Sequence, residues 1–405
     1  MLDTISCYFD EDKWLLFIGR KSFLRTNTHD DLILLQKYLD EHPHSFKTIA
    51  LSYDLKNEME DLRSSNHDRI TFPNVVCWEP EHVLSFHNDK WEVLQSNIPD
   101  EALNMGKAFI QEIEQDENGL PSLAFQPTES KDSYLEAIKG IQSEIQYGNS
   151  YEINYCQEFY AENVPDFLSS TLIKKLFETT KAPFSAYLKF DEFEVFSGSP
   201  ERYLKKTGSR LISQPIKGTI ARGHDKATDD VLKETLLQSK KDISENVMIV
   251  DLVRNDLSRI AQKGSVNVEE LAGVHSFNTV HHLVSTIVCE LKSNTSFSEI
   301  LQATFPMGSM TGAPKTSTMN IIERFEQFKR GIYSGSIGYI DPNDDFDLNV
   351  VIRSLVKNNL KKVMTCGVGG AITNQSVALN EYDECQVKVA KILQLFSNPI
   401  SSSSV

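Results

Sequence analysis

The stretch Gln214-Pro215-Ile216-Lys217-Gly218-Thr219 places a primary amine between a proline-stiffened turn and a glycine. Earlier in the chain, Ser199-Pro200-Glu201 places a carboxylate directly after another turn. We expect each turn to join the strands of a β-hairpin, so that two hairpins bring Lys217 and Glu201 together. An amine nucleophile beside a proton donor suits an enzyme that replaces a hydroxyl group on a small molecule. On these residues alone, a solvated turn lysine is the commoner interpretation of Lys217.

Composition predicts a cytoplasmic protein. The six cysteines are scattered without a CxxC pair, which favours reduced thiols and argues against a zinc site. The first residues lack the pattern of a signal peptide, and no apolar run is as long as a membrane span, so we expect no membrane partner. The net charge of -16 argues against nucleic acid as a partner. An anionic substrate would need local positive charge from Lys217, Arg353, Lys388 or a metal ion.

Strand and helix signals are mixed along the chain. Residues 14–18, 151–159, 193–196 and 209–212 are expected to be strands, and residues 30–39, 133–147 and 228–260 are expected to be helical, the last as one or two helices. The mixture has no regular βαβ order, which predicts the α+β class. The polar, turn-rich stretch at 115–121 is the predicted boundary between an N-terminal subdomain, 1–125, and a catalytic domain, 126–395. The serine-rich tail, 396–405, is expected to be disordered.

Two pairs of acidic residues have helical spacing. Asp242 and Glu245 lie three residues apart, as do Glu381 and Glu384, and Lys388 follows one turn later. Each pair can therefore point one way, and two such helices facing each other would offer oxygen ligands to Mg²⁺. Solvated helix faces are the commoner outcome in a chain with 57 acidic residues.

A glycine-containing loop at 308–316 is not a phosphate-binding loop, because Ala313 and Pro314 separate Gly312 from Lys315. The next residues have helical spacing, with Met319, Ile322, Phe325 and Phe328 forming one apolar stripe. The loop therefore delivers a helix N-terminus, whose free N–H groups can meet an anion.

Several further motifs follow Lys217 in a fixed order, and they are Glu245-Asn246-Val247-Met248-Ile249-Val250-Asp251-Leu252-Val253-Arg254-Asn255-Asp256-Leu257, Val280-His281-His282-Leu283-Val284-Ser285, Phe305-Pro306-Met307-Gly308-Ser309-Met310-Thr311-Gly312-Ala313-Pro314-Lys315, Gly367-Val368-Gly369-Gly370 and Glu381-Tyr382-Asp383-Glu384. With the two turns, this series resembles the chorismate-utilising enzymes over residues 130–395. The resemblance implies two large antiparallel β-sheets packed as a sandwich with helices outside, and N- and C-terminal parts that interlock.

The resemblance also implies roles for individual residues. Glu245 and Glu384 match the magnesium ligands of the family, with Asp242 and Glu381 beside them. The matching positions for chorismate binding are Gln157, Thr219, His282, Ser309, Tyr339, Arg353, Gly369, Gly370 and Lys388. Tyr339 and Arg353 both fall on strand-like segments. Read alone, Arg353 is more often a surface ion pair and His282 a satisfied core histidine.

The resemblance further distinguishes between reactions. Family members that add water to make isochorismate carry a lysine base at the position assigned to Gln157, and a small residue where this chain has Lys217. We therefore expect Lys217 to attack ring position 2 covalently, Glu201 to protonate the departing hydroxyl, and ammonia to complete aminodeoxychorismate. Anthranilate or isochorismate synthesis and a non-catalytic chorismate-binding subunit are the alternatives.

This mechanism makes two further demands. Attack needs neutral amine, so we expect burial to lower the pKa of Lys217 to about 7 or 8. The chain has no evident glutaminase motif, so a separate glutamine amidotransferase is the expected partner that supplies ammonia.

Overall fold

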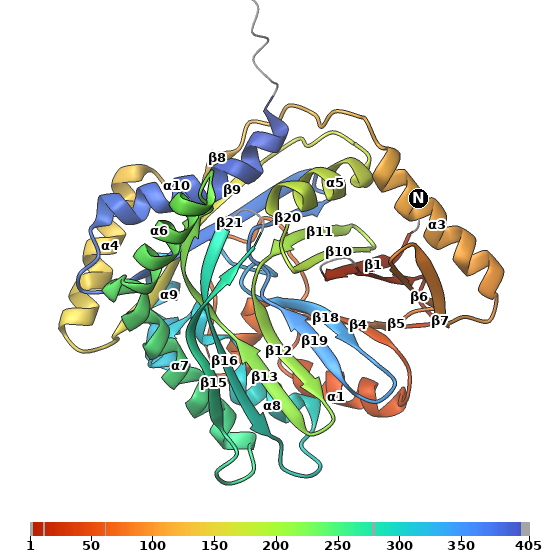
Figure 1. Cartoon of the computed structure of the whole chain (residues 1–405), viewed down its shortest axis with the longest axis horizontal. Helices are drawn as coiled ribbons and strands as arrows, with labels where there is room; N and C mark the ends of the chain where they lie inside the picture. The colour runs from red at the N-terminus through yellow and green to blue at the C-terminus, as the bar shows by residue number, and fades with distance from the viewer. Residues whose placement is uncertain (1–2, 11–12, 61, 278–279, 398–405) are drawn as a thin grey trace, which may run out of the picture.

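Two antiparallel β-sheets form the body of the molecule (Figure 1). The structure is a computed structural model that describes residues 3–10, 13–60, 62–277 and 280–397. The first sheet has eleven strands, in the order β17 (Gly312–Ala313), β9 (Glu152–Ala161), β21 (Val363–Ile372), β20 (Ser354–Asn358), β11 (Phe193–Ser199), β10 (Phe184–Phe190), β1 (Ile5–Asp10), β2 (Lys13–Ile18), β6 (His82–His87) and β7 (Lys90–Gln95), with β8 (Gln126–Pro127) beside β9.

The second sheet has ten strands, in the order β14 (Ile216–Ala221), β16 (Val280–Glu290), β13 (Arg210–Gln214), β12 (Arg202–Thr207), β19 (Phe346–Asn349), β18 (Ser336–Ile340), β4 (Lys47–Leu51), β5 (Val75–Glu79) and β3 (Ser22–Thr26), with β15 (Asn267–Ser276) beside β16. The predicted α+β class and its two large antiparallel sheets are confirmed.

The inner faces of the sheets pack on each other. Trp78 of β5 meets Phe190 of β10 with ring centroids 6.1 Å apart, and both belong to one buried cluster that draws on the two sheets. Buried polar groups also join the layers, since the hydroxyls of Ser6 and Thr48 lie 2.6 Å apart. A sandwich therefore forms because alternate residues of these strands turn apolar side chains inward.

Helices cover the outer faces. The eleven-stranded sheet packs on α3 (Pro99–Gln115), α4 (Lys131–Gln146), α5 (Ser169–Thr180), α9 (Lys315–Phe325) and α10 (Ala378–Leu393). The ten-stranded sheet packs on α1 (Asp31–Glu41), α7 (Lys240–Ile260) and α8 (Phe297–Thr304), and α6 (Lys226–Leu237) lies along β14. The short helices are α2 (Lys56–Met59), η1 (Tyr53–Leu55), η2 (Gly308–Met310) and η3 (Gln394–Phe396).

Most of the predicted elements are present. The expected strands appear as β2, β9, β11 and β13, and the segment 228–260 forms two helices, α6 and α7. Two details differ. Phe328 lies beyond the end of α9, and Arg353 precedes β20 with a positive φ of 52° instead of lying in a strand.

The N-terminal residues are built into both sheets, because β1, β2, β6 and β7 extend the first and β3, β4 and β5 the second. Residues 116–125, which include most of the predicted linker at 115–121, contain no helix or strand. Phe396, placed in the predicted tail, is 1% exposed within the core beneath α10. Residues 398–405 lie outside the described residues.

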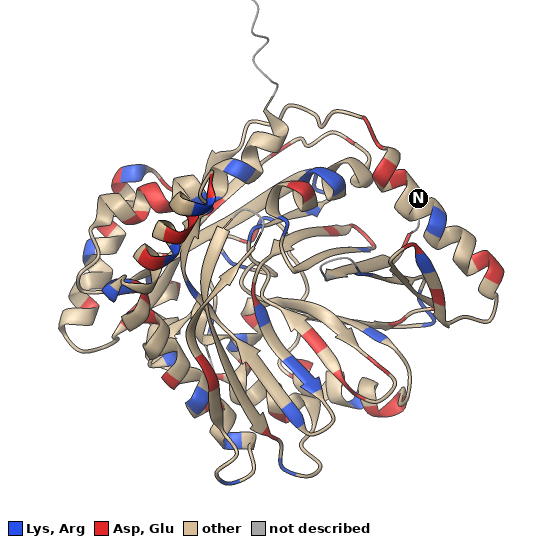
Figure 2. Ribbon diagram, in the orientation of Figure 1, with Lys and Arg blue, Asp and Glu red and all other residues tan. Residues whose placement is uncertain are grey.

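Charges of both signs are interspersed over the molecule, and α3, for example, carries acidic and basic turns (Figure 2). In the described part of the chain, no helix has both the length and the apolar character needed to cross a membrane.

Candidate functional site

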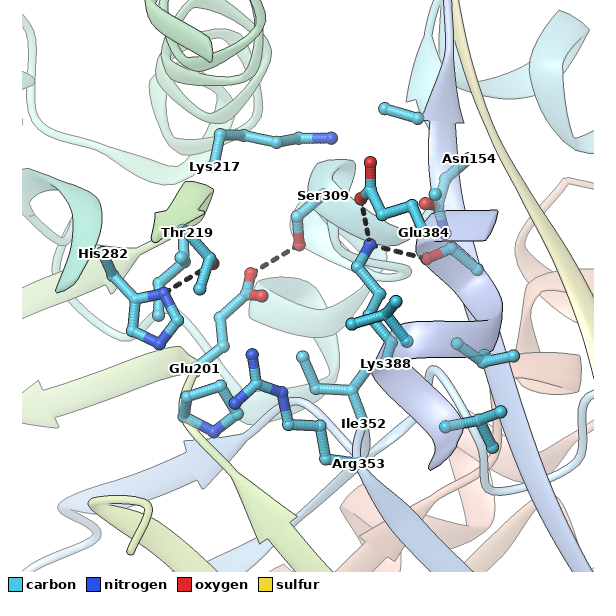
Figure 3. A pocket seen from close by; sticks show the side chains of 18 of the residues that line it. Asn154, Glu201, Lys217, Thr219, His282, Ser309, Ile352, Arg353, Glu384 and Lys388 are labelled. Atoms are coloured by element: carbon cyan, nitrogen blue, oxygen red, sulfur yellow. Dashed lines mark hydrogen bonds and ion pairs between the residues drawn. The ribbon is translucent and has the colours of Figure 1, made fainter. Parts of the chain in front are cut away.

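A cavity of about 530 Å³ brings most of the predicted site residues together. Its walls come from both sheets and from two outer helices, since β14, β21, α7 and α10 all contribute side chains. Figure 3 shows Lys217, Glu201 and Arg353 directed into this space, with Glu384 and Lys388 on its other side.

Lys217 reaches the cavity through an irregularity in its strand. β14 pairs with β16 at Ile216 and again at Thr219, but the register shifts between them. Such a bulge bends the strand and re-aims a side chain. Gly218 occupies the bulge with φ +84°, and a Cβ there would lie 3.0 Å from the Cβ of Asp242 on α7. The glycine therefore permits both the turn and the close approach of α7.

Gly218→Ala tests this account of the bulge. An L side chain at positive φ costs about 1–2 kcal/mol, and the contact with Asp242 adds strain. We expect urea denaturation to show a free energy of unfolding lower by about 1–2 kcal/mol. Gly208→Ala is the matched control, because Gly208 also has positive φ but a Cβ there meets nothing within 4 Å. If both variants lose the same free energy of unfolding, the cost comes entirely from the positive φ, and the contact with α7 contributes nothing.

Glu201 is a buried carboxyl that accepts a short hydrogen bond from a serine hydroxyl. It follows β11, is 4% exposed, and accepts a hydrogen bond of 2.6 Å from the Ser309 hydroxyl. Burial raises its pKa to about 7, although the Ser309 hydrogen bond and the charge of Lys217 oppose the rise. A carboxyl with this pKa is partly protonated near neutral pH, so its acid form is available to donate a proton.

The amine of Lys217 is paired with a residue that the motifs did not single out. Its Nζ lies 2.7 Å from Oε1 of Glu152 on β9, a carboxylate that is 1% exposed. Burial lowers the pKa of Lys217, but the charges of Glu152 and Glu245 outweigh burial and raise the pKa above its ordinary value. The prediction that burial brings this pKa to about 7 or 8 is therefore wrong for the ligand-free protein, whose amine is a cation.

Arg353 supplies the positive charge expected for an anionic substrate. Its guanidinium lines the cavity below Glu201 (Figure 3), and no ion pair within 4.0 Å includes it in the described part of the chain. Burial lowers the pKa of Arg353, which remains far above neutral pH. A guanidinium without a partner can hold a carboxylate through two parallel hydrogen bonds.

His282 and Thr219 are neighbours on paired strands. The Thr219 hydroxyl lies 2.7 Å from Nδ1 of His282. Burial and the nearby charge of Arg353 lower the pKa of His282 to about 3, so the ring is neutral. A neutral imidazole adds hydrogen-bonding capacity to the cavity wall without adding charge.

The two acidic pairs face each other from α7 and α10, joined by Lys241. The ammonium of Lys241 lies 3.0 Å from Glu381 and 3.9 Å from Glu245. Burial raises the pKa of Glu245 to about 7, and its buried Oε1 has no hydrogen-bond partner among the described residues. Asp242 instead accepts a hydrogen bond from Ser239, the N-cap of its own helix.

These carboxylates fit a cation such as Mg²⁺ only with additional ligands. Among the described residues, no group of three or more His, Cys, Asp or Glu side chains could hold a metal ion. Mg²⁺ uses one or two protein carboxylates and completes its shell with water and substrate oxygens. Oε1 of Glu245, which accepts no hydrogen bond among the described residues, and the carboxylate of Glu384 across the cavity suit that requirement.

Lys388 ties α10 to the glycine segment of β21. Its ammonium lies 2.7 Å from Glu384 and donates to the carbonyl of Gly369 at 3.0 Å. Burial raises the pKa of Glu384, but Lys388 and the other nearby ammonium groups outweigh burial and lower it. Gly369 and Gly370 both line the cavity. A Cβ on Gly369 would lie 2.4 Å from Sγ of Cys156, so only glycine fits against β9.

Two predicted residues do not line the cavity. Gln157 lies in β9 with alternate neighbours Tyr155 and Phe159, whose side chains belong to the core under the outer helices, so it faces away from Asn154. Tyr339 packs against Tyr8 and Phe17 between the sheets. The tyrosine in the cavity wall is Tyr333, whose ring occupies the space that a Cβ on Gly367 would need.

Comparisons with known proteins found relatives of this chain. A family model described as chorismate binding enzyme matches residues 7–394. Aminodeoxychorismate synthase component 1 of Escherichia coli (strain K12) is 34% identical over 382 residues, which cover 91% of this chain and 83% of that protein. Aminodeoxychorismate synthase of Streptomyces griseus is 42% identical over 266 residues, which cover 65% of this chain and 36% of that longer protein.

A solved structure shares the fold. The crystal structure of anthranilate synthase component I from Streptococcus pneumoniae TIGR4 superposes with a TM-score of 0.82 at 24% identity, over 94% of this chain and 92% of that one.

Proposed function

Because this chain belongs to the chorismate-binding enzyme family, we propose that it is component I of aminodeoxychorismate synthase and converts chorismate and ammonia to 4-amino-4-deoxychorismate. The observation that carries the proposal is a lysine, Lys217, whose side chain is only 10% exposed and which shares the cavity with a buried carboxyl, Glu201, whose acid form is available near neutral pH. The product would serve para-aminobenzoate and folate synthesis. The relatives from Escherichia coli and Streptomyces griseus support this branch of the family.

The chemistry is two successive allylic displacements. The neutral amine of Lys217 forms a bond to ring position 2, and the ring double bonds shift as the 4-hydroxyl leaves. Glu201 gives its proton to that hydroxyl, which departs as water. Ammonia then forms a bond at position 4, and the bond between Lys217 and position 2 breaks. One proton from the ammonia nitrogen returns to Glu201 and restores its acid form. Arg353 holds a substrate carboxylate during both steps.

Glu245 and Glu384 are the residues that would hold Mg²⁺, with Glu381 and Asp242 next to them on the same helices. Bound there, the cation would neutralise and orient the carboxylate on the substrate ring.

A partner must supply ammonia. The name of the Escherichia coli relative, component 1, implies a second component for that enzyme. We assign this chain a glutamine amidotransferase subunit as partner, with ammonium salt as a substitute in vitro. Six buried cysteines without a disulfide support a reducing, cytoplasmic location.

Product identity tests the function. Purified protein is incubated with chorismate, Mg²⁺ and ammonium, with and without an aminodeoxychorismate lyase, and the products are identified by mass spectrometry. We expect aminodeoxychorismate, converted to para-aminobenzoate by the lyase, and no turnover when Mg²⁺ is removed with a chelator. Anthranilate or isochorismate as the main product would contradict the assignment. Chorismate binding without turnover would indicate a regulatory subunit.

Arg353→Lys tests the anion site. Lysine keeps the charge but loses the planar pair of donors, so we expect KM for chorismate to rise about tenfold to a hundredfold with a smaller change in kcat. Arg324→Lys is the matched control, because Arg324 is 58% exposed on α9 and pairs with Glu144 outside the cavity. Steady-state kinetics on both variants measure the difference. An unchanged KM in Arg353→Lys would remove Arg353 from substrate binding.

A further inference from the structure

Glu152 is the group that contacts the Lys217 amine, and the proposed mechanism gives it no role. Among the described residues, it provides the only ion pair within 4.0 Å of Nζ. Its Oε1 accepts from Lys217, while its buried Oε2 has no hydrogen-bond partner among the described residues. A buried carboxylate with one ammonium partner and one unsatisfied oxygen is costly to maintain, which favours a functional explanation.

The backbone holds Glu152 firmly in place. β9 pairs with β17 through Ala313, and the Ser150 hydroxyl lies within hydrogen-bond distance of both the Glu152 carbonyl, at 3.0 Å, and the Ala313 carbonyl, at 2.9 Å. Lys217 comes from the other sheet, so the ion pair joins the two layers of the sandwich behind the cavity. Glu152 does not line the cavity itself and therefore acts through Lys217.

The lysine needs a proton acceptor before it can attack. The other acidic groups whose charges act on it are Glu245, Glu201 and Glu384. Glu201 must donate a proton in the same step and is hydrogen-bonded to Ser309. Glu384 is paired with Lys388, and Glu245 lies beyond 4.0 Å from Nζ. Glu152 alone is already in hydrogen-bond contact with the ammonium.

The geometry points to Glu152 as the residue that takes a proton from the Lys217 ammonium when the amine attacks and returns it when the amine is expelled. This inference rests on the proposed function. In the forward step an N–H bond of Lys217 breaks and an O–H bond forms on Glu152. The reverse transfer accompanies cleavage of the bond between Lys217 and the ring, so no proton is gained or lost at this pair over a full cycle.

Glu152→Gln tests the transfer, since the amide keeps the size and can accept a hydrogen bond but cannot take up a proton. We expect kcat to fall about a hundredfold or more, with KM for chorismate changed less than about threefold. Glu152→Asp, which restores a carboxylate, should recover part of the lost kcat. Glu158→Gln is the matched control, because Glu158 is a buried carboxylate on the same strand that pairs with Arg69.

A carboxylate that merely holds Lys217 as a cation predicts the opposite result. Its removal would leave more neutral amine, so kcat would stay constant or rise in Glu152→Gln, and either outcome would overturn the inference. A fall in kcat for Glu152→Asp as large as that for Glu152→Gln would also overturn it, provided that circular dichroism shows both variants folded.

A second measurement does not depend on turnover. The pH dependence of Lys217 labelling by trinitrobenzenesulfonate, followed by peptide mass spectrometry, reports the neutral fraction of the amine. In Glu152→Gln the labelling curve should move down by about one pH unit or more, since the nearest anion is lost. An unmoved curve would refute the pairing. If wild-type protein makes a product other than aminodeoxychorismate, the proposed function fails, while the labelling curve and the kcat for that product still test Glu152.

Discussion

Lys217→Ala is expected to reduce formation of aminodeoxychorismate by about a thousandfold or more, because the variant has no nitrogen that can bond to ring position 2. The product assay with chorismate, Mg²⁺, ammonium and a lyase measures the loss. Removal of this cation also leaves Glu152 buried without its ion-pair partner and takes one of two nearby ammonium groups from Glu245, which can lower stability. A second variant is therefore needed to separate chemistry from folding.

Lys217→Arg provides that separation. The guanidinium keeps the positive charge and can still pair with Glu152, but it does not lose its proton in proteins. We expect a folded protein with a melting temperature close to that of wild type and with activity as low as in Lys217→Ala. Turnover with ammonia near the wild-type rate in either variant would refute the nucleophile. Lys263→Ala, an exposed lysine after α7, serves as the control for lysine loss in general.

The motifs predicted which residues gather around one cavity, because each motif occupies a strand, loop or helix that borders it. Acidic residues three apart on α7 and α10 do point toward each other, as helical spacing requires. The turns at Pro200 and Pro215 are local features of proline and follow from the sequence. The partners of the flanking strands do not, because Pro200 lies between strands of different sheets and Pro215 lies between two strands that both pair with β16.

The predictions for Gln157, Tyr339 and the pKa of Lys217 were wrong for two reasons. One is which face of a strand a side chain occupies, and the other is contact between the two sheets. Neighbouring residues of a strand face opposite sides of the sheet. Gln157, predicted to bind chorismate, is on the core face of β9. Glu152 and Asn154 are on the opposite face, toward Lys217 and the cavity. Tyr339 lies in a strand as predicted, but its face of β18 meets the first sheet, and Tyr333 takes the cavity position after a turn.

The charge state of Lys217 could not be predicted for the same reason. Its partner lies on the other sheet, 65 residues away in sequence, and no local pattern marks that contact. From the sequence alone, the glutamine at 157 indicates that the chain lacks a base able to activate water. Because Gln157 is on the core face of β9 and a carboxylate, Glu152, contacts Lys217 from the other face, that indication does not hold. The choice between family reactions therefore depends on Lys217 itself and on product analysis.

Glu201→Gln is the second change with a large expected effect. The amide cannot protonate the leaving hydroxyl, so we expect kcat to fall about 10²–10⁴-fold. In wild type the acid form of Glu201 must be present, and its pKa is raised to about 7. The part of kcat/KM that depends on this group should be complete below pH 7 and decline as pH rises through about 7. Glu201→Gln should lose that alkaline decline along with the rate.

The pH dependence of kcat/KM in Ser309→Ala tests the hydrogen bond between Ser309 and Glu201. The Ser309 hydroxyl donates to the Glu201 carboxylate at 2.6 Å and so favours the charged form and lowers its pKa. Without this donor the pKa of Glu201 should rise further, and the alkaline decline of kcat/KM should move to higher pH. A decline that stays in place in Ser309→Ala, or one that persists in Glu201→Gln, would assign the titration to another group and exclude Glu201 as the acid.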